Sequence, residues 1–405
     1  MKSLCLFTES FPFGNLDDWL NDEIIFLSKK FQHIYIYPLN YTGKQSFELP
    51  ANVTVIKFDF YSPYNRLKLI VSDLSFILSI YFCELKNSNH KLNYITDFFI
   101  NLNFLLQKIN CAKELYKNLV VNQIELKSAV FYSYWFNCWM ETLCILKGQS
   151  KIDKLVTRAH GGDLYEERRK QSGGYFRFRS FMMKQLNYVL PISGFGSEYL
   201  KTRYPDYSNK VLTSRLGVFD RGLNELNTTF TIVSCSALVP LKRVHLIVEI
   251  LKNIKFNIIW YHLGGGAEYE RIAKLINKLP PNIDAKLLGH LKIEDVYGFY
   301  KSHSVNLFIN VSETEGIPVS IMEAISYGIP VIATKVGGTE EIVNNENGYL
   351  IDKEFDCERS ANIIAELYEN KNKQITLSRN ARQFWNEHYN AENNYNAFTD
   401  IIKEL

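Results

Sequence analysis

One stretch of the sequence, Ser312–Val343, constrains the fold more than any other. It holds two glutamates eight positions apart, Glu315 and Glu323, on either side of Pro318. Proline suits the first turn of a helix because its missing N–H would be unpaired there anyway, and Gly328 favours the end of that helix. The stretch is predicted to form a strand–loop–helix–strand–loop unit, which places free backbone N–H groups and two carboxylates at one edge of a sheet.

Such an arrangement suits a sugar nucleotide. Helix N-termini and glycine loops attract phosphate, and a carboxylate accepts hydrogen bonds from two neighbouring hydroxyls, as ribose presents them. The alternative is that both glutamates are solvated charges on a loop and a helix. We favour ligand binding because Glu323 falls on an otherwise apolar helix face with Ile321, Ala324 and Ile325.

The stretch also resembles the donor-site signature of retaining GT-B glycosyltransferases, the large family called glycosyltransferase family 4. That signature reads E-G-x-P, a second Glu, then G-x-P-V-I-A and G-G-x-x-E. The matching residues here are Glu315-Gly316-Ile317-Pro318, Glu323, Gly328-Ile329-Pro330-Val331-Ile332-Ala333 and Gly337-Gly338-Thr339-Glu340-Glu341. The match extends over about thirty positions, so it is far more specific than a lone glycine-rich motif.

The resemblance implies an α/β fold of the GT-B type, with two Rossmann-like doubly wound domains facing a cleft. A chain of 405 residues is long enough for two domains. We expect an N-terminal, acceptor-side domain over residues 1–219 and a C-terminal nucleotide-sugar donor-binding domain over 230–390, joined by a polar linker at 220–229. The last helix, 391–405, is expected to pack back on the first domain.

Two adjacent cations, Lys242 and Arg243, open the predicted helix Val244–Leu251. Cations at a helix start form a phosphate site because charge and free helix N–H groups then act together; the alternative is a solvated helix start. Family members usually carry Arg five residues before this Lys and Gly directly after it. Ala237 and Arg243 stand at those positions, and we expect Arg243 to replace the missing arginine in binding a diphosphate.

A polar loop containing His160, Gly161, Gly162 and Asp163 follows another predicted strand. It resembles the family's H-G-x-D element, in which the histidine lies against the donor sugar. A lone histidine is more often structural, but the motif favours a functional one. The expected role of His160 is positioning and polarising rather than general base catalysis.

Further donor-binding residues follow from the resemblance. The loop amides around Gly316, Ile317, Pro318 and Val319 are expected to help hold the diphosphate, and Gly265 lies in a Gly264–Gly266 turn similar to the family's glycine turn facing the donor. Gly14, in the loop after the first predicted strand, is expected to contribute to acceptor or donor binding; a simple turn glycine explains it about as well.

Composition argues against several other classes of protein. A net charge of only +3 argues against a dedicated nucleic-acid binder. The seven cysteines are scattered without C-x-x-C pairs, which indicates buried thiols in a reducing compartment and neither disulfides nor a zinc site. No D-x-D run follows a strand, so a metal-independent enzyme without a cofactor is predicted. No secretory signal is recognised, and a cytoplasmic location is expected.

Two segments leave alternatives open. The apolar run Leu67–Leu85 is interrupted by Lys68, Asp73 and Glu84, so it falls short of a membrane span; a buried helix is the simpler interpretation, and a helix lying on a membrane surface is the alternative. The basic run Arg168–Lys184 is interpreted as a solvated loop and helix start, with a mobile flap near an anionic acceptor as the alternative.

The resemblance implies a retaining hexosyltransferase that moves a sugar from a nucleoside diphosphate sugar to a glycan or lipid-linked saccharide acceptor, in synthesis of a bacterial surface polysaccharide. Lys242 would stabilise the leaving diphosphate, Glu315 and His160 would act at the sugar, and Glu323 would hold the ribose. Peripheral contact with the inner face of the cytoplasmic membrane is expected. The alternatives are a GT-B epimerase or phosphorylase, or a non-catalytic GT-B partner subunit, since the arginine expected at position 237 is missing.

Overall fold

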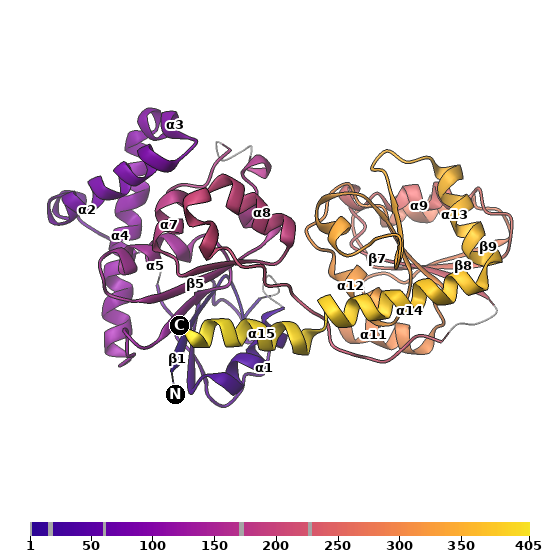
Figure 1. Cartoon of the computed structure of the whole chain (residues 1–405), viewed down its shortest axis with the longest axis horizontal. Coiled ribbons are helices and arrows are strands. Elements are labelled where there is room, and N and C mark those ends of the chain that lie inside the picture. The colour runs from indigo at the N-terminus through magenta and orange to yellow at the C-terminus, as the bar shows by residue number, and fades with distance from the viewer. Residues whose placement is uncertain (1, 15–18, 60–61, 170–173, 226–228) are drawn as a thin grey trace. The chain divides into compact units, whose positions relative to one another are not determined.

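The computed structural model describes residues 2–14, 19–59, 62–169, 174–225 and 229–405. The chain divides into two compact units (Figure 1). The N-terminal unit consists of Met1–Ser214 with Tyr395–Leu405, and the C-terminal unit consists of Arg215–Asn394. Part of the predicted linker, residues 226–228, lies outside the described residues.

The N-terminal unit is built on one six-stranded sheet whose strands all run parallel, in the order β3-β2-β1-β4-β5-β6. A parallel sheet is covered by helices on both faces, which is why its strands are apolar along almost their whole length. The strands are β1 (Ser3–Thr8), β2 (His33–Pro38), β3 (Val53–Val55), β4 (Val130–Ser133), β5 (Lys154–Ala159) and β6 (Tyr188–Pro191).

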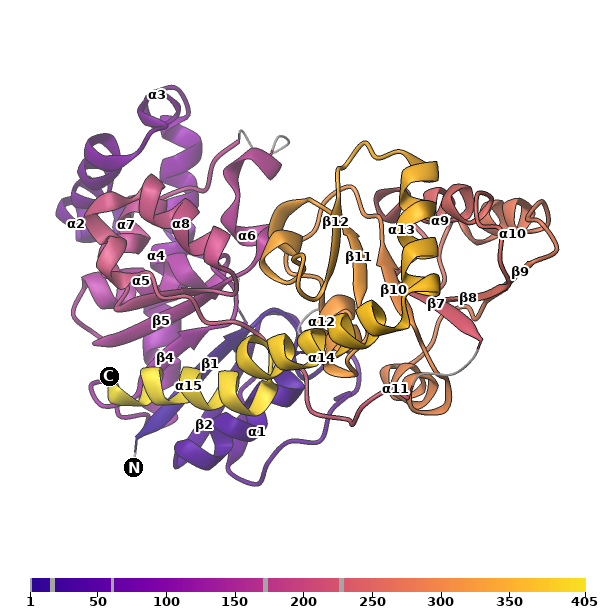
Figure 2. The ribbon, with the colours of Figure 1, turned by 45° about the vertical axis from the view of Figure 1, so that its right-hand side comes forward.

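Helices cover both faces of this sheet. Because side chains alternate along a strand, Leu4 and Leu6 of β1 pack with α1 and α15, while Cys5 and Phe7 pack with α4 and α5. Helices α1 and α15 lie side by side in both views, although they come from opposite ends of the chain (Figures 1 and 2). The helices are α1 (Leu20–Lys30), α2 (Arg66–Asn87), α3 (Lys91–Thr96), α4 (Phe98–Val121), α5 (Trp139–Gly148), α6 (Gly161–Leu164), α7 (Arg179–Gln185), α8 (Gly194–Arg203) and α15 (Ala391–Glu404).

The C-terminal unit repeats this plan with a second parallel sheet, in the order β12-β11-β10-β7-β8-β9. Helices α9 and α13 cover one face, and α11, α12 and α14 cover the other (Figure 2). The elements are β7 (Phe230–Cys235), α9 (Val244–Leu251), β8 (Ile258–Leu263), α10 (Tyr269–Ile276), β9 (Ile283–Leu287), α11 (Ile293–Ser302), β10 (Leu307–Asn310), α12 (Val319–Ser326), β11 (Val331–Thr334), β12 (Gly348–Ile351), α13 (Cys357–Glu369) and α14 (Lys371–His388).

The α/β fold predicted from the sequence is confirmed, and the differences lie at element ends and edges. The sequence Asp17–Lys30 has helical periodicity; Asp17 lies outside the described residues, and α1 begins at Leu20. The apolar run Val53–Phe58 predicts a longer strand, but β3 is an edge strand and pairs with β2 only over Val53–Val55. Strand β12 was not predicted, because four residues are too few to show a period.

The apolar region from residue 67 to 120 folds into three helices, α2, α3 and α4. Within the described ranges, no helix of the protein is both long enough and apolar enough to cross a membrane. Buried side chains of α2 and α4 join the core of the N-terminal unit, with Ile77 and Ile80 from α2 and Leu105 and Ile109 from α4. The buried-helix interpretation of this region is therefore confirmed for one side of α2.

A fully buried ion pair holds several elements of the N-terminal unit together. Arg158 of β5 lies 2.9 Å from the carboxylate of Glu23 in α1, and neither side chain is exposed. Tyr132 donates to the same carboxylate at 2.7 Å, and Arg158 donates to the Ser214 carbonyl at 2.7 Å. The guanidinium also lies 3.9 Å from the ring centre of Phe398 in α15. Arg158 therefore links β5 to α1, to Ser214 and to α15. Through Glu23, the same cluster also includes β4.

Removing one partner of this pair should be strongly destabilising, because the other charge then stays buried and uncompensated. We expect Arg158→Met to lower the stability of the N-terminal unit by about 3–5 kcal/mol and Glu23→Leu/Arg158→Met to recover most of that loss. Lys127→Met, at an exposed ion pair with Asp153, should change stability by less than about 1 kcal/mol. Calorimetric unfolding measures the stability of all three variants. An Arg158 variant as stable as the Lys127 variant would contradict the stabilising role of the buried pair.

Candidate functional site

A lysine and a glutamate from neighbouring strand ends meet in the C-terminal unit. Lys242 closes a short 3₁₀ turn, Pro240–Lys242, after β7, and Glu315 lies in the loop after β10. Because β7 and β10 are adjacent and parallel, their following loops emerge at the same edge of the sheet. The Lys242 Nζ lies 2.6 Å from the Glu315 Oε1, and the Asn310 amide donates to that oxygen at 3.3 Å.

Glu323 is buried inside α12 and lacks part of its hydrogen bonding. Only 4% of the residue is exposed, and its Oε1 has no partner among the described residues. Burial raises the pKa of Glu323 to about 7, opposed by a hydrogen bond from Tyr297 and by the charge of Arg221. A buried carboxylate oxygen without a donor is costly, so this oxygen is suited to accept a hydroxyl from a ligand.

Two glycines fix the loop that carries Glu315. A Cβ at Gly337, where φ is +52°, would lie 2.1 Å from the Glu315 carbonyl oxygen, and one at Gly338 would lie 2.2 Å from that of Gly316. Only glycine permits the two backbones to approach so closely. A Cβ at Gly316 would meet no atom within 4 Å. Packing therefore explains the Gly337-Gly338 pair but not Gly316, whose open side leaves the backbone accessible.

The glycine turn after β8 positions the segment that leads to Lys242. Gly264, at φ +142°, would place a Cβ 1.9 Å from the Ser236 carbonyl oxygen, and a Cβ at Gly265 would lie 3.1 Å from the His290 amide nitrogen. The turn therefore packs against the segment that follows β7 and against the segment that follows β9. Gly265 lies at the same sheet edge as the loop after β7, and that it binds the donor stays a prediction.

Helix α12 begins beside the Glu315 loop. Pro318 is its N-cap residue and Val319 its first residue, while Ile317 is almost fully buried. Proline lacks an N–H, so the free donors at this end of the helix start with Val319. The N-terminus of α12 is thus attached to the loop that carries the Lys242–Glu315 pair.

Arg243 has different partners from the lysine beside it. Its backbone is left-handed, with φ +48° and ψ +33°, at the position where the family signature has glycine. Its Nε donates to the Val311 carbonyl at 2.8 Å, and its guanidinium lies 3.8 Å from Glu354. The side chain therefore ties the start of α9 to the loop after β10. That Arg243 also binds a diphosphate stays a prediction.

In the N-terminal unit, His160 is the N-cap residue of α6 and is buried. Its Nε2 lies 3.1 Å from the Tyr134 carbonyl, which can only accept, so the ring proton is on Nε2. Burial and the charge of Arg158 lower the pKa of His160 to about 3. The imidazole is therefore neutral at physiological pH. Asp163 accepts the backbone N–H groups of His160 and Phe136, both at 2.6 Å, and so fixes this loop.

Two further segments of this unit, the loop with Gly14 and the basic run Arg168–Lys184, make contacts within the unit itself. The Gly14 N–H donates to the Ser10 carbonyl at 3.2 Å, as in a simple turn. In the basic run, residues 170–173 lie outside the described residues. Arg179 is buried rather than solvated: its guanidinium stacks 3.6 Å from the ring centre of Phe136 and donates to the Asp163 carbonyl. The prediction of a solvated helix start is wrong for Arg179, because aromatic rings cover it.

Three side chains around the site were missed from the sequence. Asn310 contacts Glu315, and Tyr297 and Arg221 surround Glu323, with the Arg221 guanidinium 3.6 Å from the ring centre of Tyr297. Asn310 was predictable in principle, since it ends a buried strand at the edge where sites form. Arg221 and Tyr297 come from distant segments, and nothing in the sequence links them. Among the described residues, no group of three or more His, Cys, Asp or Glu is placed to hold a metal ion.

Comparison with known proteins relates the C-terminal unit to a known protein family. Residues 219–384 match the family model described as glycosyl transferases group 1. The match covers most of the C-terminal unit and none of the strands and helices of the N-terminal unit up to Ser214. The group 1 region contains Lys242, Glu315 and Glu323, so the charged side chains gathered at the sheet edge all lie within it. His160 and Gly14 lie outside the matched residues.

Sequence relatives are glycosyltransferases that match part of the chain. An uncharacterized glycosyltransferase of Methanocaldococcus jannaschii is 28% identical over 59% of this chain and 65% of its own length. The putative colanic acid biosynthesis glycosyltransferase WcaL of Escherichia coli is 27% identical over 49% of this chain and 51% of its own. The chain thus spans about half to just under two thirds of the length of these two relatives.

The fold of this chain is shared with solved structures over its full length. HepE of Anabaena, solved in complex with UDP, has a TM-score of 0.70 and 16% identity, with 100% of both chains covered. At this identity the likeness establishes the GT-B fold alone.

The buried charge at Glu323 predicts a pH-dependent stability. The pKa of Glu323 is 4.5 in the unfolded chain and about 7 in the folded unit. The stability that this group contributes is therefore present below about pH 4.5 and is lost as the pH rises through 7. We expect Glu323→Gln to stabilise the C-terminal unit by about 2–3 kcal/mol at pH 8 and by much less at pH 5. Glu313→Gln, at a half-exposed neighbouring glutamate, should show no such difference in thermal unfolding.

The left-handed backbone at Arg243 predicts an unusual order of stability. Both Arg243→Ala and Arg243→Gly lose the bonds to the loop after β10, but glycine alone relieves the strained backbone. We therefore expect the glycine variant to be more stable than the alanine variant by about 1 kcal/mol. At Glu249, an interior residue of helix α9, the order should reverse. Calorimetry measures both pairs, and an alanine advantage at position 243 would contradict the strain.

Proposed function

We propose that the protein is a retaining glycosyltransferase of family 4 that transfers a hexose from a nucleoside diphosphate sugar to a glycan or lipid-linked saccharide acceptor. The observation that carries the proposal is the set of side chains at one sheet edge of the group 1 region: the Lys242–Glu315 pair and the buried Glu323 with an unpartnered oxygen. A cation and two carboxylates match the three parts of such a donor, namely diphosphate, sugar and ribose.

Lys242 would stabilise the charge that grows on the leaving nucleoside diphosphate, which is where electrostatic catalysis acts. In the structure, this ammonium is neutralised by Glu315. A diphosphate carries more negative charge than one carboxylate, so donor binding would draw Lys242 away from Glu315. Glu315 would then be free to accept hydroxyls of the donor sugar or to stabilise positive charge at its anomeric carbon.

The nucleoside end would bind at Glu323. Its unpartnered Oε1 would accept the ribose hydroxyls, which removes the cost of burying that oxygen. The free N–H groups from Val319 onward and the accessible backbone at Gly316 would contact the diphosphate. HepE has been solved with UDP-glucose, which supports a nucleotide sugar as the donor class. Lys242 is the cation of this proposal, and no metal ion or cofactor is invoked.

His160 would touch the donor sugar without transferring a proton. Burial holds its imidazole neutral, with a pKa of about 3, and its Nε2 proton is engaged by the Tyr134 carbonyl. The His160 side chain also accepts the Asp163 backbone N–H in the capping box of α6, so both sides of the ring are held and it would contact the sugar by packing. We therefore assign it a positioning role, and we propose front-face attack by the acceptor because no carboxylate is assigned as a nucleophile for a double displacement.

The acceptor class rests on the relatives. Similarity to WcaL, whose name places it in colanic acid biosynthesis, supports a role in making a bacterial surface polysaccharide. Acceptors of that kind are carried on membrane lipids, so the proposal places the protein in the cytoplasm at the inner face of the cytoplasmic membrane.

A thermal-shift panel of UDP-, GDP- and ADP-sugars tests the donor assignment. One nucleotide class should raise the unfolding temperature, because a ligand at about a hundred times its dissociation constant stabilises the folded state by about 2.7 kcal/mol. Lys242→Met should weaken the binding of that sugar nucleotide by about tenfold or more. Lys252→Met, a half-exposed lysine paired with Glu249 in the same unit, is the matched control and should bind normally.

Turnover separates the proposed reaction from its alternatives. With the donor alone, a transferase releases little nucleotide, whereas an epimerase converts the donor sugar and a phosphorylase forms donor from phosphate. Binding of no sugar nucleotide, or equal binding by the Lys242 and Lys252 variants, would contradict the site. Detection of the epimer would overturn the reaction type while leaving the site intact.

A further inference from the structure

Helix α2 is apolar on two opposite sides, and only one of them is buried. Side chains such as Leu69, Ile77 and Ile80 face the core of the N-terminal unit. A second stripe recurs every three or four residues, the helical period, and points to solvent. Its most exposed members, Val71 and Phe82, are 81% and 71% exposed. The full stripe is Leu67, Val71, Leu74, Leu78 and Phe82.

The exposed stripe continues onto α3 and the first turn of α4. Phe99 is 82% exposed and Leu92 is 70% exposed. Between α2 and this second group lies an almost wholly apolar groove of about 630 Å³. We call the two groups together the apolar face; its α3–α4 members are Leu92, Ile95, Phe98, Phe99 and Ile100. Proteins without a partner for such a surface rarely expose so many neighbouring large apolar side chains.

The charges around the apolar face have one sign. The exposed cations of α2 and α3 are Arg66, Lys68, Lys86 and Lys91. The carboxylates of the same region are withdrawn from solvent: Asp73 is buried and pairs with Lys113 at 2.6 Å, and Glu84 is buried and accepts the Phe181 N–H at 2.6 Å. Asp97 is half-buried. The surface therefore presents apolar and positively charged groups together.

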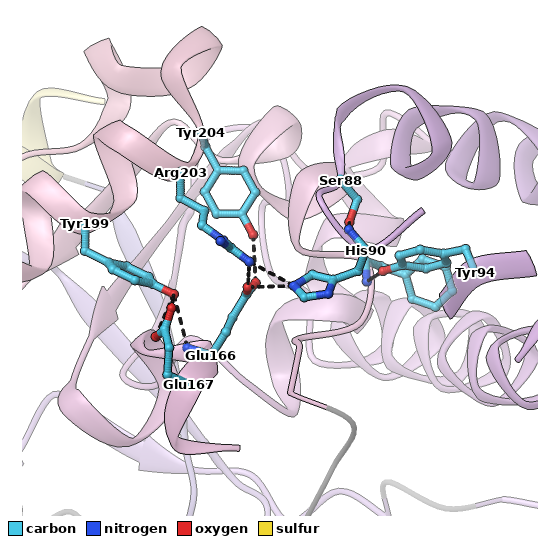
Figure 3. Close-up of polar contacts among 9 residues, drawn as sticks. Ser88, His90, Tyr94, Glu166, Glu167, Tyr199, Arg203 and Tyr204 are labelled. Carbon is cyan, nitrogen blue, oxygen red and sulfur yellow. Dashed lines mark hydrogen bonds and ion pairs between the residues drawn. The ribbon is translucent and has the colours of Figure 1, made fainter. Parts of the chain in front are cut away.

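A buried polar cluster anchors this face to the body of the unit (Figure 3). His90, in the connection from α2 to α3, lies 2.9 Å from the carboxylate of Glu166, which also pairs with Arg203 of α8 and accepts from Tyr204. In α3, the Tyr94 hydroxyl accepts the backbone N–H just before α7. These bonds hold α2 and α3 in place, so the apolar face is a fixed surface of the unit.

We propose that the apolar face docks the protein on an anionic phospholipid bilayer. Phe82, Phe99 and the aliphatic side chains beside them enter the boundary between headgroups and acyl chains, and the surrounding lysines and arginine meet the lipid phosphates. Charge complementarity selects this occupant: a partner of neutral or basic surface leaves the four cations unpaired. The proposal rests on this surface and does not depend on the donor site or on any sugar transfer.

Co-sedimentation of the full chain with phosphatidylglycerol vesicles, and separately with phosphatidylcholine vesicles, tests the proposal. We expect phosphatidylglycerol to bind the protein at least about tenfold better, with the difference shrinking as salt is raised. Phe82→Ser/Phe99→Ser should lower binding by about tenfold or more. Val120→Ser/Val121→Ser, which removes two exposed apolar side chains at the far end of α4, is the matched control and should bind as the unchanged chain does.

Fold and oligomeric state are measured on the same samples. Unchanged circular dichroism and thermal unfolding of the Phe82/Phe99 variant show that its loss of binding is not a loss of structure. Equal binding to both lipids, or normal binding by that variant, overturns the proposal. So does a dimer in solution that only the Phe82/Phe99 substitutions dissociate without any lipid binding, because a second copy then covers the face. None of these readouts uses a sugar nucleotide, so the donor assignment fails or stands separately.

Discussion

Each unit depends on one constraint: its six strands all run parallel. A parallel strand must be followed by a crossover that returns to the opposite edge, so all loops that leave the carboxyl ends of the strands gather at one edge. The loops after β7, β8, β10 and β11 meet there in the C-terminal unit. Side chains far apart in the sequence are thereby brought within hydrogen-bond distance, as the 2.6 Å contact between Lys242 and Glu315 shows.

The site is held by backbone packing and carries unfavourable electrostatics. Gly337 and Gly338 let two loops touch at a distance that any side chain would prevent. Two charged residues of the same unit are not relaxed: Glu323 is buried with an unpartnered oxygen and a raised pKa, and Arg243 takes a left-handed backbone. Strain and unsatisfied polar atoms of this kind gather where a ligand supplies the missing interactions.

The N-terminal unit divides its charged residues between its interior and its surface. Arg158 and Glu166 are buried and join elements from distant parts of the chain. His160 is kept neutral beside Arg158 by burial. The cations of α2 and α3 are exposed instead, next to apolar side chains. The same helix thus contributes one face to the core and offers another to a surface outside the protein.

The sequence by itself determined the α/β fold and the group 1 resemblance, because apolar strands, glycine turns and the spacing of Glu315 and Glu323 are local features of one chain segment. Only the tertiary structure decided which partners those residues meet. Neither the Lys242–Glu315 pair nor the separate attachment of Arg243 to the loop after β10 is encoded by spacing, since their partners lie about seventy positions away. Whether α2 is buried or lies on the surface was left open by the sequence, because an apolar residue carries no mark of whether it packs inward or outward.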